Sequence, residues 1–524
     1  MKYPIGIQSF DQIIGDGYVY VDKTGLIYQL VKGGKIYFLS RPRRFGKSLL
    51  VSTLKCYFQG RKELFKGLAI DKLETEWAEY PVFHIDFNGT DFTRSGKLDD
   101  IIGGTVGTWE KEYGRTTEFE DIGKRFAYVL QQAHQRYGRR CVVLVDEYDK
   151  PILDVLDTGY TATIDGKERL LEDIHREILK SFYSTFKLAD EDLQFVLLTG
   201  VTKFSQVSGF SGFNQPADIS MAEQYETLCG ITQEELEHYF AEPIEALAKK
   251  YETTFEGMKT MLKHRYDGYH FSDNLTDVYN PFSLLNAFSD GMLESYWFGS
   301  GTPTYLIEML RKFDVQPSEI EGIEAVAEDF DAPTERMENI TPLLYQSGYI
   351  TIKEGYPYGG IYRLGIPNKE VRTGLMSSLL PNYVQRKSQQ GRVTIVKMSV
   401  AVSEGRMDDA LRLLQTFLST VPYCNHTNYE GHYQQLLYVI FSMMSYEVDV
   451  EVRTPRGRVD VVMRTATRLY LIELKLDKSA DRAVEQINLK NYAERFALCG
   501  LPVVKVGINF DSEKGTIEDW KIVD

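Results

Sequence analysis

The sequence is poor in cysteine and has no long apolar run. Its 524 residues include five cysteines, which are odd in number, far apart and without a Cys-x-x-Cys pair. This usage suits reduced thiols in a cytoplasm. No uninterrupted apolar run approaches the roughly eighteen residues that span a bilayer, and the opening MKYPIGIQSF lacks the pattern of a secretory signal. We therefore expect a soluble, cytoplasmic protein with no membrane partner.

An excess of positive charge is also missing. The formal net charge is −15 at pH 7, which argues against a generally basic protein that coats DNA. The charge is uneven, because residues 1–60 hold nine Lys and Arg against three Asp and Glu, whereas residues 425–524 hold thirteen against fifteen. Any contact with nucleic acid must therefore be local. The chain is too long for one ordinary core, and we expect about three units.

A basic loop between a strand and a helix is the first candidate site. Residues 35–40 read as a short buried strand, and residues 48–58 have the apolar spacing of a helix. The helix start, Gly46-Lys47-Ser48, would present free N–H groups and a favourable dipole to a phosphate. Lys47 can reach the outer phosphates of a nucleotide, and Ser48 would supply a hydroxyl to Mg²⁺.

This loop departs from the usual phosphate-binding pattern. Arg41 stands where that pattern has a glycine, and Pro42 removes one backbone donor. By itself, the loop leaves open an ordinary helix start on a basic surface.

Acidic residues follow the next buried strand. Residues 141–145 are all apolar and are followed by Asp146 and Glu147. All-apolar strands are typical of a parallel sheet covered on both faces, in which ligands bind at the carboxyl ends of the strands. Asp146 would hold the Mg²⁺ shell, and Glu147 would orient or deprotonate the attacking water. The alternative is a buried strand followed by acids that cap a helix.

A third strand of this kind covers residues 193–200. Thr199, near its end, is the candidate for sensing the terminal phosphate of a nucleotide. Thr202 is equally plausible, and an ordinary hydroxyl at a strand-to-turn junction is the alternative to both.

The middle of the chain predicts helices and a hairpin. Residues 234–240 and 243–248 have helical spacing. Residues 345–352 and 362–366 read as strands separated by the turn-rich segment 354–360. A small helical module with a β-hairpin has the shape of a winged helix, which could contact DNA or serve as a spacer that transmits motion.

Near the end of the chain, residues 469–476 predict a strand with Glu473 and Lys475 on one face. Asp460 lies thirteen residues before Glu473, in a preceding strand. Two carboxylates on adjacent strands, together with the carbonyl of Leu474, would provide oxygen ligands for Mg²⁺. Lys475 could position a metal-activated water for hydrolysis of a phosphodiester.

Further polar residues support this second site. Glu451 lies upstream of Asp460, and Gln486 lies on the helix expected after Ser479. The set resembles the PD-(D/E)xK nuclease pattern, which implies that Glu451 is its upstream acid, with Glu430 as the competing candidate. A purely structural ion pair between Glu473 and Lys475 is the alternative.

Several motifs together resemble those of the AAA-ATPase-like proteins, which often end in a PD-(D/E)xK nuclease domain. The resemblance runs from about residue 3 to the C-terminus, and in that family an arginine at position 41 is normal. The segments that carry it are residues 20–24, 41–48, 145–151, 266–271 and 278–283.

The resemblance implies an α/β fold with three parts. These are a P-loop NTPase domain with a parallel sheet and a helical lid (1–285), a helical, winged-helix-like middle module with a β-hairpin (286–420), and a restriction-endonuclease-like α/β domain (421–524).

The expected site residues fall into three sets. The catalytic set comprises Glu147, Asp460, Glu473, Lys475 and Gln486. The nucleotide-binding set comprises Arg44, Gly46, Lys47, Ser48, Asp146 and Thr199. The metal-binding set comprises Ser48, Asp146, Glu451, Asp460 and Glu473.

The first hypothesis is an enzyme that uses ATP and Mg²⁺ and cuts nucleic acid, with DNA favoured over RNA as partner and a homo-oligomer left open. The second is a nucleotide-controlled switch or scaffold that binds nucleic acid without cutting it, as the near-neutral charge of residues 425–524 suggests. A metabolic kinase ranks third, because no acceptor site for a small molecule is visible.

Overall fold

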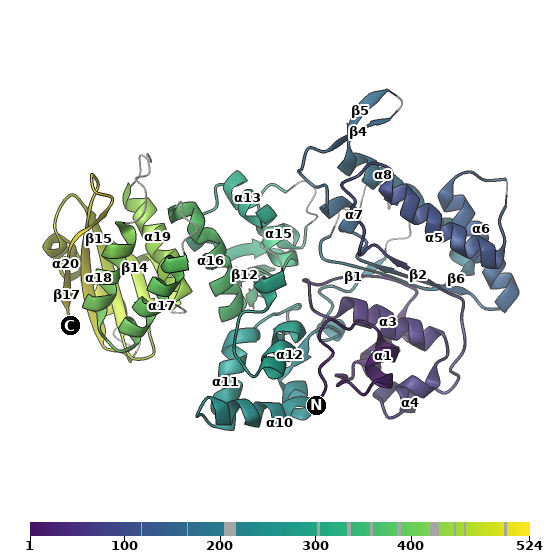
Figure 1. Ribbon diagram of the computed structural model, residues 1–524, viewed down its shortest axis with the longest axis horizontal. Helices are drawn as coiled ribbons and strands as arrows, with labels where there is room; N and C mark the ends of the chain where they lie inside the picture. Colours follow the sequence, from purple (N-terminus) through teal and green to yellow (C-terminus); the bar gives the residue numbers. More distant parts are fainter. Residues whose placement is uncertain are drawn as a thin grey trace. The chain divides into compact units, whose positions relative to one another are not determined.

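The computed structural model divides into two compact units, Met1–Glu294 with Glu324–Pro367 and Ser295–Ile323 with Asn368–Asp524 (Figure 1). No helix in the described part of the chain is long and apolar enough to cross a membrane. The structure describes residues 1–116, 118–164, 166–203, 216–300, 304–332, 337–356, 360–384, 389–419, 429–444, 447–454, 457–496 and 500–524.

The first unit contains a parallel five-stranded sheet in the order β2-β3-β6-β1-β7. Its central strands are buried, as their apolar sequences predict. The register pairs Asp86 with Asp146 and Ser40 with Gly200, so the polar ends of these strands meet at one edge. The strands are β1 (Ile36–Ser40), β2 (Val82–Asp86), β3 (Cys141–Asp146), β6 (Leu193–Gly200) and β7 (Ala217–Asp218).

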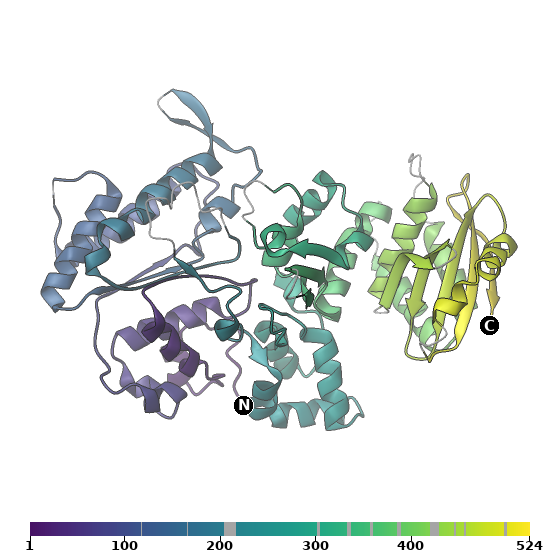
Figure 2. The ribbon, with the colours of Figure 1, turned by 180° about the vertical axis from the view of Figure 1, so that it is seen from behind.

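Helices cover both faces of this sheet (Figure 1, Figure 2). On one face lie α5 (Lys97–Tyr113), α6 (Ile122–Tyr137) and α8 (Leu171–Tyr183), whose apolar side chains form one core with β2, β3 and β6. On the other lies α3 (Lys47–Phe58), which follows β1 directly. Smaller elements of the unit are α1 (Phe10–Gly15), α2 (Thr24–Gly33), α4 (Ala69–Leu73), α7 (Lys150–Leu153), β4 (Thr161–Ile164), β5 (Lys167–Leu170) and α9 (Thr185–Leu188).

A helical group follows the sheet in the chain. The two helices expected at 234–240 and 243–248 form α10 (Gln233–Lys250), which is broken by non-helical torsions at Phe240. Pro243 explains the break, because it lacks an N–H and its ring clashes with the carbonyl four residues earlier. The other elements of this group are β8 (Ile231–Thr232), α11 (Phe255–Tyr266), β9 (Val278–Tyr279) and α12 (Pro281–Asp290).

The expected strand at 345–352 is wrong over residues 345–350 and correct only at residues 351–352. Residues 341–346 form α15 (Thr341–Gln346), with Pro342 in its first turn, and the strand β11 (Thr351–Tyr356) starts only after Gly348. Proline suits the first turn of a helix, and glycine tolerates the φ of 85° found here. The antiparallel partner is β12 (Ile361–Gly365), with β10 (Ile323–Val326) beside it and α14 (Ala327–Phe330) after β10.

The second unit contains a mixed sheet in the order β13-β14-β15-β16-β17. Only β15 and β16 run parallel, and α20 connects them and packs on both. Its strands are β13 (Glu447–Thr454), β14 (Gly457–Arg464), β15 (Leu469–Leu476), β16 (Val503–Asp511) and β17 (Thr516–Val523). Its helices are α13 (Thr304–Lys312), α16 (Lys369–Val384), α17 (Gln389–Ser403), α18 (Met407–Leu418), α19 (Tyr429–Met443) and α20 (Ala480–Leu489).

Candidate functional sites

A cavity of about 450 Å³ lies at the amino end of α3 in the first unit. Its wall combines residues 4–8, the basic loop with the start of α3, and the first turns of α12. Glu147 and Lys150 line it from the segment after β3, and Asn88 lines it from the segment after β2. The cavity therefore lies at the carboxyl edge of the parallel sheet, where ligands of such sheets bind.

The start of α3 faces this cavity with a cation and free backbone donors. Gly46 has a φ of 93° and precedes the helix, and Lys47 and Ser48 begin it. The first N–H groups of any helix lack a partner inside the helix. The Nζ atom of Lys47 lies 3.0 Å from the carbonyl oxygen of Arg41 and 3.9 Å from Oε1 of Glu147. A phosphate at this point would meet both the positive charge and the backbone donors.

Arg44 also lines the cavity. Its guanidinium carbon lies 4.6 Å from the centre of the Phe282 ring, in a cation–π contact with the start of α12. The backbone of Arg44 has a φ of 71°, which is uncommon for a residue with a side chain. The arginine side chain is therefore held on the cavity wall, between the loop and α12.

Arg41 has a different role from the other loop arginines. It is 1% exposed, and its guanidinium donates to the carbonyl oxygens of Ser40, Ser220 and Tyr225 at 2.9, 2.6 and 3.3 Å. It also stacks over Phe271 at 4.2 Å. The residue that replaces the usual glycine thus anchors the loop to neighbouring segments.

Asp146 and Thr199 lie together at the ends of two neighbouring strands. The hydroxyl of Thr199 donates to Oδ1 of Asp146 at 2.7 Å, and both residues are buried. Glu147 follows with a φ of 52° and reaches the cavity. Burial raises the pKa of the Glu147 carboxyl, and the charge of Lys47 opposes this shift.

Asp149 is a buried acid that the sequence reasoning missed. Its Oδ2 atom accepts hydrogen bonds from the N–H groups of Val201 and Thr202 at 2.9 and 2.7 Å and from the Thr202 hydroxyl at 3.0 Å. Burial raises its pKa. The Thr202 hydroxyl, the alternative to Thr199, therefore contacts Asp149. A signal was present, because Asp149 is the third acid in the segment Asp-Glu-Tyr-Asp that begins with Asp146, the last residue of β3.

In the second unit, Asp460 and Glu473 lie where β14 and β15 separate. The last pair of the ladder on this side is Val461 with Ile472, one residue from each acid. Oδ2 of Asp460 accepts the N–H of Leu474 at 2.7 Å. The Asp460 carboxylate therefore contacts the backbone of the residue directly after Glu473, and its negative charge contributes to the raised pKa of Glu473.

Glu473 is held by a lysine and a glutamine. Its Oε1 atom lies 3.0 Å from Nζ of Lys475 and accepts a hydrogen bond from the amide of Gln486 on α20. Lys475 Nζ also donates to the carbonyl oxygen of Leu474 at 2.9 Å. Glu473 is 1% exposed, and its Oε2 atom has no hydrogen-bond partner among the described residues.

The electrostatics of Glu473 favour a bound cation. Burial and then the charge of Asp460 raise the pKa of Glu473 to about 7, against the opposing charge of Lys475. A divalent cation held by these carboxylates would favour their charged forms and would lower the pKa of Glu473. The buried, unpartnered oxygen of Glu473 and the neighbouring carboxylate of Asp460 fit the oxygen ligands of Mg²⁺.

The upstream acid of this site is only partly described. Glu451 stands opposite Asp460 in the register, between the pairs Val450–Val461 and Val452–Val459. The side chains of Glu451 and of its competitor Glu430 lie outside the described residues. No group of three or more His, Cys, Asp or Glu able to hold a metal occurs among the side chains that are described.

Comparison with known proteins matches both regions. Residues 4–210 match a family model described as predicted AAA-ATPase, and residues 428–520 match the model of the PD-(D/E)XK nuclease superfamily. Over 530 residues the chain is 34% identical to an "Uncharacterized protein in vnfD 5'region" of Azotobacter chroococcum mcd 1, and the match covers 98% of each chain. The candidate nucleotide site at Gly46–Ser48 and the carboxylate pair at Asp460 and Glu473 lie inside the two matched regions.

Proposed function

Because this chain belongs to the family of AAA-ATPase-like proteins with a C-terminal PD-(D/E)XK nuclease superfamily domain, we propose that it binds and hydrolyses ATP and cleaves nucleic acid with Mg²⁺. DNA is the favoured substrate over RNA. The observation that carries the proposal is the cluster of Asp460, Glu473, Lys475 and Gln486, in which Glu473 is buried and one of its carboxylate oxygens has no partner in the described part of the chain.

The large cavity of the first unit suits the phosphates of ATP. The phosphate groups would lie against the first turn of α3, with Lys47 and Arg44 supplying positive charge. Ser48 and Asp146 would hold a magnesium ion, as residues of this type do in P-loop proteins. The bond from Thr199 keeps Asp146 in one orientation.

A second, smaller cavity suits the apolar face of the nucleobase. It has a volume of about 100 Å³ and shares Pro4, Gly46, Leu49, Pro281 and Leu285 with the first cavity. Apolar side chains make up most of its wall. A nucleotide with its phosphates at α3 could therefore place its base here.

Hydrolysis would depend on Glu147. It lines the cavity, and its carboxyl lies within 3.9 Å of the Lys47 ammonium group. Burial raises its pKa, which brings a carboxyl group nearer to the range in which it can take a proton from water. Glu147 would orient the attacking water and accept its proton.

Cleavage of a phosphodiester would depend on the residues at the end of β15. Asp460 and Glu473 would hold the metal, with Glu451 as a further ligand. Gln486 fixes the orientation of Glu473. Lys475 would place the attacking water and stabilise the negative charge that develops on the phosphate. A bound Mg²⁺ supplies Lewis acidity and a water of lowered pKa.

A second candidate function is a nucleotide-controlled switch that binds nucleic acid without cutting it. Two observations favour it. Arg41 occupies the position at which ordinary phosphate-binding loops have glycine. Residues 425–524 hold thirteen Lys and Arg against fifteen Asp and Glu, and so carry no excess positive charge.

The two candidates separate in one cleavage experiment. Purified protein is incubated with end-labelled single- and double-stranded DNA and RNA, with and without Mg²⁺ and ATP, beside Lys47→Ala and Lys475→Ala. The proposal expects Mg²⁺-dependent products that Lys475→Ala abolishes while its fold and nucleotide binding persist. Binding that persists in EDTA, with no product at any concentration of Mg²⁺ or Mn²⁺, would instead support the switch.

A further inference from the structure

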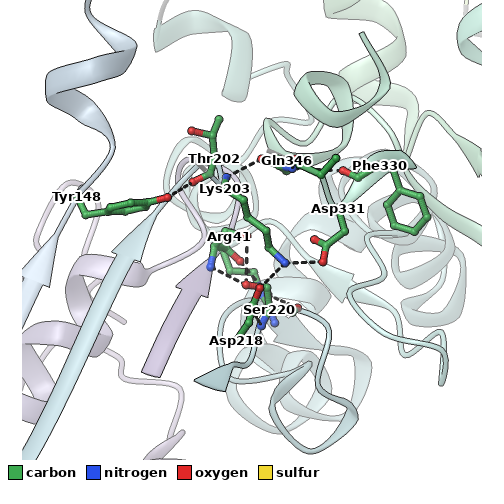
Figure 3. Close-up of polar contacts among 11 residues, drawn as sticks. Arg41, Tyr148, Thr202, Lys203, Asp218, Ser220, Phe330, Asp331 and Gln346 are labelled. Atoms are coloured by element: carbon green, nitrogen blue, oxygen red, sulfur yellow. Dashed lines mark hydrogen bonds and ion pairs between the residues drawn. The ribbon is translucent and has the colours of Figure 1, made fainter. Parts of the chain in front are cut away.

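Lys203 is a buried lysine just beyond the end of β6. Its Nζ atom lies 2.6 Å from Asp218 and 2.5 Å from Asp331, and the residue is 8% exposed (Figure 3). Its backbone N–H donates to Oε1 of Gln346 at 2.7 Å. One residue thus contacts the segment 324–367 through both its side chain and its backbone, across more than a hundred residues of sequence.

The same strand end is fixed on its other side to the nucleotide site. Thr202, directly before Lys203, is held by Asp149 through its N–H and its hydroxyl. The hydroxyl of Tyr148 donates to the carbonyl oxygen of Thr202 at 2.9 Å (Figure 3). Three residues earlier, Thr199 contacts Asp146. A shift of the acids after β3 would therefore move the backbone that carries Lys203.

The segment 324–367 also touches the basic loop between β1 and α3, which is called the phosphate-binding loop below. A Cβ atom built on Gly348 would lie 2.7 Å from Cβ of Pro42, so the turn after α15 packs directly against the loop. Only a residue without a side chain fits this contact, and Gly348 also has a φ of 85°. A movement of the loop on nucleotide binding would therefore displace this turn.

A third contact joins the segment to the motif at residues 266–271. His270 contacts the carbonyl oxygen of Ile352 through Nδ1 at 2.5 Å, and its N–H donates to the hydroxyl of Thr351 at 2.8 Å. The neighbouring Tyr269 packs edge-on against Phe45 of the phosphate-binding loop. The motif therefore lies between the loop and β11.

Inside the segment, Gln346 spreads the contact further. Its amide donates to the carbonyl oxygens of Phe330 and Ala332 at 3.3 and 2.6 Å (Figure 3). Asp331 lies between these two residues in the sequence and accepts a hydrogen bond from the Lys203 ammonium group. Gln346 is thus hydrogen-bonded to both neighbours of Asp331, so that a movement of Lys203 would displace Gln346 and Asp331 together.

The charges around Lys203 make this contact sensitive to small movements. Lys203 faces two carboxylates, and the charge of Arg41 also acts on Asp331. Leaving a buried charge without its partner is strongly unfavourable, and the Lys203 side chain is 9% exposed whereas those of Asp331 and Asp218 are 24% and 41% exposed. The buried Lys203 ammonium group therefore depends on these two carboxylates, and a movement of Asp331 would require Lys203 to rearrange with it.

We propose that Lys203 couples nucleotide occupancy at the first site to the conformation of the segment 324–367. The proposal rests on the proposed nucleotide-binding function and adds its route of regulation. The chain leaves this segment at Pro367 and enters the second unit, which carries the nuclease-like site, at Asn368. A change in the segment would thereby reach the second unit through the chain itself.

Hydrogen–deuterium exchange on the full chain tests this coupling. Exchange is compared with and without Mg²⁺ and the non-hydrolysable ATP analogue adenylyl imidodiphosphate. In the wild type we expect slower exchange in residues 41–50, which reports binding, and a changed rate in residues 341–356. In Lys203→Met the effect at 41–50 should persist, whereas the change at 341–356 should shrink by at least about threefold. Lys203→Arg should restore most of it.

The matched control is Lys259→Met. Lys259 also bridges two carboxylates, Glu237 and Glu256, at 2.9 and 3.0 Å, but these lie on α10 and α11, outside the segment 324–367. It should behave as the wild type. Asp331→Asn removes the opposite charge and should reproduce the loss, and it serves as the test if Lys203→Met does not fold.

The outcomes separate the two proposals. An unchanged response at 341–356 in both Lys203→Met and Asp331→Asn would overturn the coupling and leave nucleotide binding intact. A wild type with no response at 341–356 but slower exchange at 41–50 would do the same. No response at 41–50 in the wild type would refute the nucleotide site itself, and the coupling with it.

Discussion

The hydroxyl of Thr199 donates a 2.7 Å hydrogen bond to the carboxylate of Asp146. The two residues belong to β6 and β3, which are neighbours in the parallel sheet. The bond lies at the carboxyl ends of both strands, beside the candidate nucleotide site. It restricts the orientation of the acid that would hold the magnesium ion of a bound nucleotide.

Thr199→Val removes this bond and keeps the shape of the side chain. A hydrogen bond to a charged group contributes about 1.5–3 kcal/mol, so we expect the kcat of ATP hydrolysis to fall by roughly 10- to 150-fold. The Kd for the nucleotide should change little, because Lys47 and the start of α3 remain. Steady-state hydrolysis and equilibrium titration with a fluorescent ATP analogue measure the two quantities. Equal losses in both would contradict the role given to Asp146.

Lys47→Ala should weaken ATP binding by at least about tenfold, since it removes a charge-assisted contact to phosphate. Lys55→Ala is the matched control, because Lys55 lies on the same helix and does not line either cavity. Isothermal titration measures both affinities. Equal affinities for the two variants would show that the cavity at α3 is not the nucleotide site.

Arg41→Gly restores the glycine of the ordinary loop pattern, yet we expect it to damage the protein. It leaves the buried carbonyl oxygens of Ser40, Ser220 and Tyr225 without their donor. The free energy of unfolding should fall by at least about 3 kcal/mol, measured by urea denaturation. Arg44→Gly, in the same loop, should cost little stability, because glycine suits its φ of 71°. An Arg41→Gly protein as stable as the wild type would contradict the anchoring role.

Asp267, in the motif at 266–271, should make stability depend on pH. Burial and the charge of Asp277 raise its pKa to about 7, while Lys263 and His270 oppose the shift. Because its folded-state pKa exceeds the unfolded value of 3.8, the folded state binds the extra proton, and stability falls as the pH rises from about 4 to about 7.

Asp267→Asn should remove this contribution. The variant should lose less Tm than the wild type between pH 5 and pH 7.5, as measured by calorimetry. Asp277 does not obscure the comparison, because its pKa is lowered and its own titration falls below this window. An identical pH dependence in both proteins would show that Asp267 does not titrate there.

The central strands of both sheets could be predicted because their signal is local. The runs before Asp146, around Thr199 and before Glu473 are apolar enough to require burial, and their polar ends follow directly in the sequence. The hydrogen-bond partners of Thr199 could not be predicted, because they depend on strand order. The same holds for the contact between Lys203 and Asp331, because these two residues lie 128 residues apart in the sequence.

Local signals also misled in one place. The expected strand begins at Tyr345, but Tyr345 and Gln346 are the last residues of the helix α15, which has Pro342 in its first turn and is followed by Gly348 with a φ of 85°. The sequence shows Arg41 as a departure from the loop pattern. Its role as an anchor depends on Ser220 and Tyr225, which only the fold brings near it.

The most direct test of the account is cleavage of labelled double-stranded DNA in Mg²⁺ by the wild type, Glu473→Gln and Glu485→Gln. Glu485 is the matched control, an exposed acid that precedes Gln486 on α20. The account predicts products with the wild type and Glu485→Gln and none with Glu473→Gln, at equal thermal stability. Equal cleavage by Glu473→Gln, or no cleavage of any nucleic acid by the wild type in Mg²⁺ or Mn²⁺, would contradict it.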